Sequence, residues 1–331
     1  MNGFLLWTHR AQKKSKKLKK ILQKLLVKKK QVILLFSLPT VLFIVLILIV
    51  ISDNSLRNEI YVERLFPISF QVPTQAPYPT INSKTIYPQI SAKAAIVIDD
   101  DSKVVLFSKN SDQILPMAST TKIMTALIAL QAYKPNDVLI ADGANISGVT
   151  IGLKKDERMF FKDLLYGMLL PSGNDVAYTL STNYPGGEKE FINEMNQKAK
   201  ELKLNNTHFE DPIGLSENNY TTALDLSRLA SIAIKNPVFR EVVSTKNKTI
   251  KDRSGLTEYK LTNLNKLLGQ NGVNGIKTGF TDEAGEVLVT SRKDNNHTTI
   301  IVVMKSEDRF ADTKEMLSLI NGNLIYQSIH P

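Results

Sequence analysis

Residues 116–132 read PMASTTKIMTALIALQA, and this stretch decides how the rest of the chain is interpreted. Apolar residues recur at helical spacing within it, at Ile123, Leu127 and Leu130. That spacing predicts an α-helix from about Ser119 to Ala132. Ser119 and Lys122 stand three positions apart, so both side chains would lie on one helix face with Cβ atoms roughly 5–6 Å apart.

A serine and a lysine on one helix face are a possible nucleophile and base. A serine hydroxyl reacts poorly until a base removes its proton, and a desolvated lysine can be that base. Because Pro116 and two further residues precede the helix, Ser119 is expected in its first turn, where free N–H groups can stabilise an oxyanion. The alternative is a helix with a capping serine and a surface lysine, and the motif alone does not exclude it.

Short β-rich runs of sequence come before this helix and again after the helices that follow it. Ala94–Ile98 and Val104–Ser108 are joined by the turn residues Asp99–Ser102, which predicts a hairpin. Further helices are expected at 161–169, 174–182, 187–203 and 221–235. Strands are expected again at 275–281, 286–291 and 298–304, with a last helix at 309–326.

This order of elements predicts an α+β fold. Strands from both ends of the region would form one antiparallel sheet of about five strands, flanked by helices. The middle of the chain would be inserted as a mostly helical subdomain. The globular domain is expected to span residues 90–331.

A second motif, Ser172-Gly173-Asn174, falls in a turn between two of the expected helices. Pro171 and Gly173 favour a tight loop that would hold one hydroxyl and one amide. The pattern is common, since serine precedes asparagine at this spacing also at Ser52, Ser108, Ser181 and Ser216. The copy at Ser52 lies before Ser119 and next to an apolar segment, so it is rejected. An ordinary helix cap is the alternative for any single copy.

A third motif, Lys277-Thr278-Gly279, occurs once and falls on an expected strand. Lys277 and Thr278 would point to opposite faces of that strand. Gly279 has no side chain and lets another backbone or a ligand approach closely. The alternative is an edge strand protected by a lysine.

The three motifs in this order are the set known from penicillin-binding proteins and class A β-lactamases. The chain resembles the low-molecular-weight penicillin-binding proteins, which are serine D-alanyl-D-alanine carboxypeptidases. The likeness runs from about Ala94 to Tyr326 and includes four stretches beyond the bare motifs. They are PMAS at 116–119, SGND at 172–175, FEDPIGL at 209–215 and GIKTGFTDEAG at 275–285.

The resemblance implies a role for each residue of the first two motifs. Ser119 would attack the penultimate D-Ala carbonyl of a peptidoglycan stem peptide, and Lys122 would be its base. The pKa of Lys122 would have to fall, and repulsion from Lys277 is expected to lower it. Ser172 would pass a proton to the leaving amine, and Asn174 would bind the substrate amide and hold Lys122.

The resemblance also implies that the third motif binds the substrate. Lys277 and Thr278 would receive the C-terminal carboxylate, beside Gly279. The backbone N–H groups of Ser119 and Phe280 would form the oxyanion hole. Penicillin resembles the D-Ala-D-Ala terminus and should acylate Ser119. Many members have histidine at the position of Phe280, and many add a C-terminal β-rich domain, which leaves open whether terminal D-Ala or a cross-link is cleaved.

The N-terminus has the pattern of a membrane anchor. The chain carries 42 Lys and Arg against 32 Asp and Glu, a net charge of +10. Residues 1–30 hold eleven of these cations and no acid, so the remainder sums to −1. Residues 32–51 are twenty residues without a charge, about the length that crosses a bilayer as a helix.

These features predict a basic cytoplasmic tail at 1–31 and an uncleaved transmembrane signal anchor at 32–51. A proline-rich stalk at 52–89 would follow, with the catalytic domain outside the cell membrane. A buried core helix is the alternative to the span. The tail could also lie on anionic lipid. A nucleic-acid partner is not expected, because the body of the chain is nearly neutral.

Other chemistries find little support. The chain has no cysteine, which excludes disulfides and thiol catalysis, and its four histidines are scattered. No metal and no cofactor is expected. A class A-like β-lactamase would need a glutamate followed four residues later by asparagine, and Glu188, Glu190 and Glu194 lack that partner. An inactive membrane-tethered binding protein is the remaining alternative.

Overall fold

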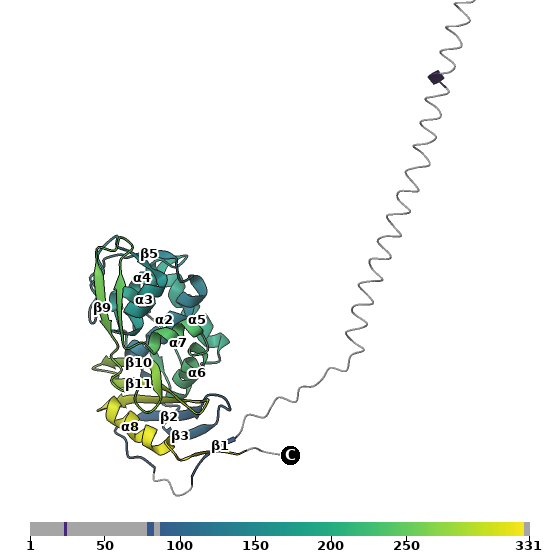
Figure 1. Ribbon diagram of the computed structural model, residues 1–331, viewed down its shortest axis with the longest axis vertical. Helices are drawn as coiled ribbons and strands as arrows, with labels where there is room; N and C mark the ends of the chain where they lie inside the picture. The colour runs from purple at the N-terminus through teal and green to yellow at the C-terminus, as the bar shows by residue number, and fades with distance from the viewer. Residues whose placement is uncertain (1–22, 25–77, 83–86, 328–331) are drawn as a thin grey trace, which may run out of the picture. The chain divides into compact units, whose positions relative to one another are not determined.

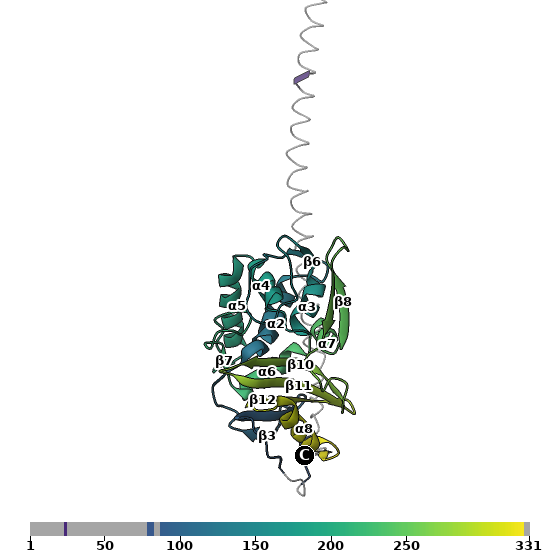
Figure 2. The ribbon, with the colours of Figure 1, turned by 90° about the vertical axis from the view of Figure 1, so that its left-hand side faces the viewer.

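A computed structural model of the chain describes residues 23–24, 78–82 and 87–327. The chain divides into two units, residues 1–74 and 75–331, and the architecture below is that of the second. In Figure 1 the central sheet of this unit has most of the helices on one side and α8 on the other. The same arrangement is visible after a quarter turn in Figure 2.

The central sheet has five antiparallel strands in the order β10-β11-β12-β2-β3. Their bounds are Ala94–Asp99 (β2), Val105–Lys109 (β3), Val273–Thr281 (β10), Gly285–Asp294 (β11) and His297–Ser306 (β12). The first hairpin therefore pairs with the last strand of the C-terminal meander. The predicted α+β fold, with a five-stranded sheet from both ends of the domain, is confirmed.

Helices cover both faces of this sheet. α8 (Arg309–Ile320) packs on β11 and β12, while α6 (Ala223–Ala233) packs on β2 and β12. Because side chains alternate along a strand, Val97 and Ile301 join the apolar cluster under α8. Their neighbours Ile96 and Ile300 join the larger core shared with the helical region. β2 is consequently buried along its whole length.

The middle of the chain is mainly helical, as predicted. It contains η1 (Ala118–Thr121), α2 (Lys122–Ala132), α3 (Phe161–Leu169), α4 (Asn174–Thr182), α5 (Gly187–Glu201), α6 and α7 (Pro237–Val243). Three short antiparallel pairs lie among these helices. They are β4 (Leu115–Pro116) with β7 (Tyr220–Thr221), β5 (Val138–Ile140) with β6 (Arg158–Phe160), and β8 (Asn247–Lys251) with β9 (Glu258–Thr262).

α7 and the three pairs are absent from the expected elements. The start of α7 carries a readable signal, because Asn236 accepts hydrogen bonds from the backbone of Val238 and Phe239 and Pro237 occupies the first position. The short pairs carry none, since each strand has only two to five residues. In one of the three pairs, β4 with β7, the two strands are also far apart in sequence.

The last expected helix, 309–326, is wrong at its C-terminal end. α8 stops at Ile320, where Asn321 and Gly322 follow and Gly322 adopts a φ of +72°. The chain then forms β13 (Leu324–Gln327), which pairs antiparallel with β1 (Tyr78–Ile81). β1 lies inside the range expected as a stalk, so residues 78–81 form part of a strand pair in the second unit.

The membrane expectations fall outside the described residues. This holds for the anchor at 32–51, for the basic tail apart from residues 23–24, and for the stalk apart from residues 78–82 and 87–89. Among the residues that the structure describes, no helix has both the length and the apolar character needed to cross a bilayer.

Candidate active site

Ser119 lies in a short 3₁₀ turn that leads into α2, not in the first turn of the α-helix itself. The turn begins at Ala118, whose φ of +47° is rare for a residue with a side chain. Within it the hydroxyls of Thr120 and Thr121 donate to the carbonyls of Met117 and Ala118 at 2.6 and 2.8 Å. The two threonine hydroxyls are therefore used within the turn. The half-buried Ser119 hydroxyl has no such bond within the turn.

Lys122 is fully buried and points at Ser119. Its Nζ donates to Ser119 Oγ at 3.0 Å, to Asn174 Oδ1 at 2.8 Å and to the Ile213 carbonyl at 2.8 Å. Three acceptors match the three donors of an ammonium group. The predicted contact between serine and lysine is therefore present, and so is the contact between Asn174 and Lys122.

Burial lowers the pKa of Lys122 from its usual value to about 7. The carboxylates of Asp211 and Asp175 oppose this shift but do not cancel it. The expectation that repulsion from Lys277 is the cause is corrected here, because loss of water around the ammonium group dominates. Burial first, and then repulsion from Lys122 and Arg309, hold the pKa of Lys277 well below its usual range.

Asn174 begins α4, and both the oxygen and the nitrogen of its side-chain amide are hydrogen-bonded. Its Oδ1 accepts from Lys122, and its Nδ2 donates to the Ser147 carbonyl at 2.7 Å. The Asn174 backbone N–H also donates to the Val149 carbonyl at 2.7 Å. Gly148 stands between them with φ +82°, and a Cβ there would lie 2.7 Å from Nδ2. The loop at 147–149 therefore fits tightly over the asparagine.

Ser172 lies in the predicted tight turn with a φ of +69°. The residue is only 4% exposed, and its Oγ has no hydrogen-bond partner among the described residues. A buried hydroxyl without a partner is costly in a folded protein. Such a group is available to a bound ligand.

Lys277, Thr278 and Gly279 lie on β10, an edge strand of the sheet. Both polar side chains are buried, and Lys277 Nζ donates to the Thr278 carbonyl at 2.9 Å. At Gly279 a Cβ would lie 3.2 Å from the backbone nitrogen of Ser119 and 3.1 Å from Ala118 Cβ. As predicted, another backbone approaches this glycine closely. It belongs to η1, the turn that carries Ser119, which is called the nucleophile turn below. Phe280 follows with 59% of its surface exposed.

Arg309 adds a cation that the motifs do not contain. It begins α8, and its Nη1 donates to the Gly279 carbonyl at 2.8 Å. Burial lowers the pKa of Arg309, and its charge is one of the causes that lower the pKa of Lys277. Lys277 and Arg309 therefore donate to the neighbouring carbonyls of Thr278 and Gly279. Nothing in the sequence places residue 309 beside residue 279, because the contact depends on the sheet register.

The loop at 211–219 packs against the nucleophile turn. Asp211 Oδ1 accepts from the backbone of Ile213 and Gly214, and its Oδ2 accepts from the backbone of Ser216 at 2.7 Å. This arrangement presents the Ile213 carbonyl to Lys122. At Gly214, φ is +93° and a Cβ would lie 2.0 Å from the Ala118 carbonyl oxygen. The resemblance singles out this stretch, but sequence reasoning assigned it no role.

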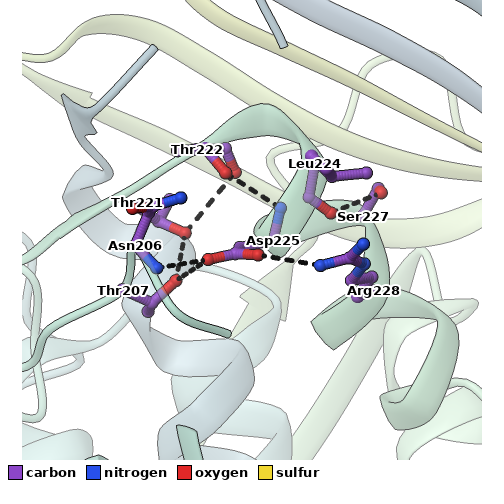
Figure 3. A network of polar contacts seen from close by, with 8 residues as sticks. All are labelled: Asn206, Thr207, Thr221, Thr222, Leu224, Asp225, Ser227 and Arg228. Atoms are coloured by element: carbon purple, nitrogen blue, oxygen red, sulfur yellow. Dashed lines mark hydrogen bonds and ion pairs between the residues drawn. The ribbon is translucent and has the colours of Figure 1, made fainter. Parts of the chain in front are cut away.

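A buried polar network anchors the strand that follows this loop (Figure 3). Asp225 is 2% exposed and accepts from the backbone of Asn206 at 2.9 Å and from the Thr207 hydroxyl at 3.1 Å. Thr207 in turn shares a hydrogen bond of 2.8 Å with Thr221. Thr221 belongs to β7, which pairs with β4 just before the nucleophile turn. The network thus fixes the entry of the chain into η1.

No group of three or more His, Asp or Glu side chains that could hold a metal ion occurs among the described residues. The glutamates Glu188, Glu190 and Glu194 all lie on α5, and none of them hydrogen-bonds Ser119 or Lys122 within the described structure. Lys122 thus contacts Ser119 and Asn174, Gly279 lies against the turn that carries Ser119, and no described hydrogen bond links the Ser172 hydroxyl to these groups. They suit acyl transfer through a serine activated by an amine.

Residues 81–308 match the Peptidase S11 family, described as D-alanyl-D-alanine carboxypeptidase. The chain belongs to this family. A D-alanyl-D-alanine carboxypeptidase of Bacillus subtilis, DacF, is 35% identical over 238 residues, and the match covers 68% of this chain and 61% of that protein. A D-alanyl-D-alanine endopeptidase of Escherichia coli is 34% identical, over 70% of this chain and 78% of that protein.

The fold of this family member also matches a solved structure. The crystal structure of the Streptomyces K15 DD-transpeptidase is similar with a TM-score of 0.67 and 32% identity. The match covers 71% of this chain and 98% of that one. The catalytic region of this Peptidase S11 protein therefore has the DD-peptidase fold, and the family is one of serine hydrolases.

Proposed function

We propose that the protein is a serine DD-carboxypeptidase that removes the terminal D-Ala from peptidoglycan stem peptides and is inhibited by penicillin. The observation that supports this most directly is the hydrogen bond of 3.0 Å between Lys122 Nζ and Ser119 Oγ. With its pKa at about 7, Lys122 is uncharged in about half of the molecules near neutral pH. A neutral amine in this position can take the serine proton.

Acylation would proceed in two steps. Lys122 removes the proton from Ser119 Oγ as the oxygen attacks the carbonyl carbon of the penultimate D-Ala. The carbonyl oxygen becomes an oxyanion, for which the backbone N–H groups of Ser119 and Phe280 are the proposed donors. The C–N bond then breaks, and Ser172 delivers a proton to the departing D-Ala amine. Water hydrolyses the resulting ester on Ser119 and releases the shortened peptide.

The substrate carboxylate would bind beside β10. Lys277, Thr278 and Arg309 place an amine, a hydroxyl and a guanidinium around the stretch that ends at Gly279. Hydrogen bonds from a cation to a carboxylate are stronger than neutral ones, so the Arg309 guanidinium favours a free C-terminus. Asn174 would receive the peptide amide while it keeps Lys122 in place. A free terminus is what a carboxypeptidase requires.

Cleavage of cross-links is the second candidate. Two relatives at 32% and 34% identity, from Pseudomonas aeruginosa and Escherichia coli, are named D-alanyl-D-alanine endopeptidases. The two activities share the acyl-enzyme and differ in the leaving amine. A β-lactamase and an inactive binding protein stay as alternatives that the same experiments separate.

The test is covalent labelling of the full-length chain with a fluorescent penicillin, beside a Ser119→Ala variant. An adduct on the wild type alone, seen by denaturing gel and intact mass, would support Ser119 as the nucleophile. No adduct with intact drug would indicate an inactive binding protein, and no adduct with destroyed drug would indicate a β-lactamase. Release of D-Ala from a pentapeptide, compared with cleavage of a cross-linked dimer, then separates the two peptidase activities.

We also propose that the protein is a single-pass membrane protein with a cytoplasmic N-terminus and an extracytoplasmic catalytic domain. The charge-free stretch 32–51 after a tail of eleven cations supports this. The proposed parts are the tail at 1–31, the anchor at 32–51, a stalk from 52 and the catalytic domain. The proposed substrate lies outside the membrane, which agrees with this topology.

A further inference from the structure

Asp175, the second residue of α4, has a buried carboxylate that accepts only from backbone N–H groups in the described structure. The residue is 7% exposed, and no ion pair among the described residues involves it. Its Oδ1 accepts from Ile151 at 3.1 Å and from the next residue of α4 at 3.0 Å. Its Oδ2 accepts from Gly152 at 2.9 Å and from Leu153 at 3.0 Å. A buried carboxylate needs donors of this kind, and three of the four belong to the loop at 147–153.

The first half of the same loop holds Asn174. The Ser147 carbonyl accepts from Asn174 Nδ2, and the Val149 carbonyl accepts from the Asn174 backbone N–H, both at 2.7 Å. Asn174 Oδ1 then accepts from Lys122 Nζ at 2.8 Å. Asn174 and Asp175 are neighbours on α4, and they therefore bind the two halves of one loop.

This loop has no helix or strand of its own, since it lies between the end of β5 and the start of β6. Residues 147–150 are exposed. Gly148 and Gly152 adopt φ values of +82° and +85°, which residues with side chains rarely reach. An irregular segment with few buried contacts takes its position from its hydrogen bonds. In the second half of the loop, three successive backbone N–H groups donate to Asp175.

We propose that Asp175 is a positioning residue for acylation: its carboxylate fixes the loop at 147–153, and the loop holds the Asn174 amide that orients Lys122. This inference rests on the proposed function, because it concerns the acylation of Ser119. The Asp175 charge also raises the pKa of Lys122, which is a separate, electrostatic effect. Measurements at pH 9 exclude that effect, since Lys122 is then largely uncharged with or without the carboxylate.

Asp175→Asn is the direct test, in the full-length chain kept in detergent. An amide has a single acceptor oxygen, so in either orientation its NH₂ group faces backbone N–H groups that lose their acceptor. At pH 9 the rate constant for acylation of Ser119 by a fluorescent penicillin should fall about 10–100-fold. Asp99→Asn is the matched control, because the Asp99 carboxylate is also buried and accepts from Ser102 and Tyr326. It should leave the rate constant unchanged, and an equal effect of the two substitutions would overturn the proposal.

A double-mutant cycle tests whether Asp175 acts through Asn174. In an Asn174→Ala background, Asp175→Asn should lower the acylation rate constant no further, because the amide that the loop positions is already absent. A loss as large as in the wild-type background would overturn the proposal. A residue that only stabilised the fold would not show this dependence.

Hydrogen exchange provides a readout that does not require activity. In Asp175→Asn, the protection of the amides at 151–153 and of the Asn174 amide should fall by about tenfold. Unchanged protection would overturn the proposal even if the wild type reacts with penicillin. A wild type that does not react, with protection lost in the variant, would contradict the proposed function and still support the role of Asp175 in holding the loop.

Should Asp175→Asn fail to fold, Gly152→Ala disturbs the same loop and leaves Asp175 and Asn174 in place. Gly152 and Gly255 are both exposed, with φ values of +85° and +76°, and a Cβ at either would meet no atom within 4 Å. Alanine is therefore strained similarly at both positions, but of the two only Gly152 donates to Asp175. Gly152→Ala should lower the acylation rate constant about three- to tenfold, and Gly255→Ala should not. Equal rate constants in these two variants would overturn the proposal.

Discussion

Lys122 has three hydrogen-bond acceptors, and none of them is a carboxylate. A carboxylate in contact would hold the ammonium charged and unable to accept a proton. The serine hydroxyl, the Asn174 amide and the Ile213 carbonyl instead fix the position of Nζ while burial lowers its pKa. Geometry and basicity are therefore set by separate features, and each can be changed on its own.

The first prediction concerns the pH dependence of acylation. Only uncharged Lys122 can take the proton of Ser119, and its pKa is about 7. The rate constant for acylation by a fluorescent penicillin should therefore be constant above about pH 8. Below about pH 6 it should fall close to tenfold for each unit. Stopped-flow or timed gel measurements from pH 5 to 9 would check this.

Asp211→Asn tests the electrostatic contribution of a nearby carboxylate to the pKa of Lys122. Its carboxylate raises the pKa of Lys122, so the inflection should move to lower pH in the variant. A flat profile down to pH 5 in the wild type would count against Lys122 as the base.

The second prediction is that Lys122→Met separates activity from stability. The acylation rate constant should fall by roughly 10²–10⁴-fold, because the base is lost. Stability should not fall with it, since methionine fills similar volume without the cost of burying a charge. Fluorescent labelling and thermal unfolding on the same preparation would show both.

The pH dependence of unfolding provides a control for this variant. The unfolded chain holds its Lys122 proton up to about pH 10.5, whereas the folded chain releases it near pH 7. The penalty for burying this charge is thus complete below pH 7 and disappears toward pH 10.5, so this group makes stability rise with pH. The methionine variant should show a smaller rise, and an equal rise would contradict the assigned pKa.

At the scale of elements, two loops and one short strand pair position the residues of the candidate active site. The loop at 211–219 presents a carbonyl to Lys122, the loop at 147–149 fixes Asn174, and β4 paired with β7 delivers the chain into η1. All three join segments that are far apart in sequence. The strand–helix motifs supply the reactive groups, and these irregular segments set their positions.

The third prediction tests the network that holds β7. Asp225→Ala removes the Oδ2 atom that accepts from both Asn206 N–H and the Thr207 hydroxyl, and leaves these two donors without that partner. We expect a loss of about 2–3 kcal/mol, or a fall in Tm of roughly 4–10 °C. Calorimetry would measure the change in unfolding. The exposed Asp112→Ala should stay within about 0.5 kcal/mol, and an equal Tm for the two variants would contradict the role of the network.

The sequence predicted regular elements well because their signals are local. Helical spacing identified α2 to α6, and the first two motifs contain Lys122 and its hydrogen-bond partners Ser119 and Asn174. The contribution of Ile213 could not be predicted, because its carbonyl carries no sequence signal. Arg309 reaches Gly279 only through the sheet register, and β13 was read as helix since its true partner, β1, is more than 200 residues away.

At the scale of the whole molecule, the sheet and the strand pair β1–β13 join opposite ends of the second unit. β1 brings the N-terminal side of the unit to the strand that follows α8. The unit therefore has to start before residue 78 if it is to keep all its described strands. The fourth and fifth predictions follow from this arrangement and from the proposed anchor.

The fourth prediction compares two truncated chains. One begins at residue 75, and the other begins at residue 90, where the sequence alone places the domain. The shorter chain lacks β1 and leaves β13 as an unpaired strand, with Leu324 less covered. We expect its Tm to be lower by several degrees with unchanged penicillin labelling of Ser119. Equal unfolding curves would show that the strand pair adds nothing to stability.

The fifth prediction tests the proposed anchor. The full-length chain should sediment with membranes and resist extraction by salt and alkali, because twenty charge-free residues would hold it in the bilayer. The chain that begins at residue 75 should stay in the supernatant and still react with fluorescent penicillin. Recovery of the full-length protein in the soluble fraction would exclude the anchor.

The pairing of β2 with β12 also has a consequence for the order of folding. β2 ends at Asp99 and β12 begins at His297, so nearly two hundred residues separate two adjacent strands. At roughly 5–20 residues per second, the ribosome needs about 10–40 s to make that interval. During this time β2 lacks its partner β12, and unpaired strand edges invite aggregation. The edge of β2 is therefore covered only after the last strands of the sheet have been made.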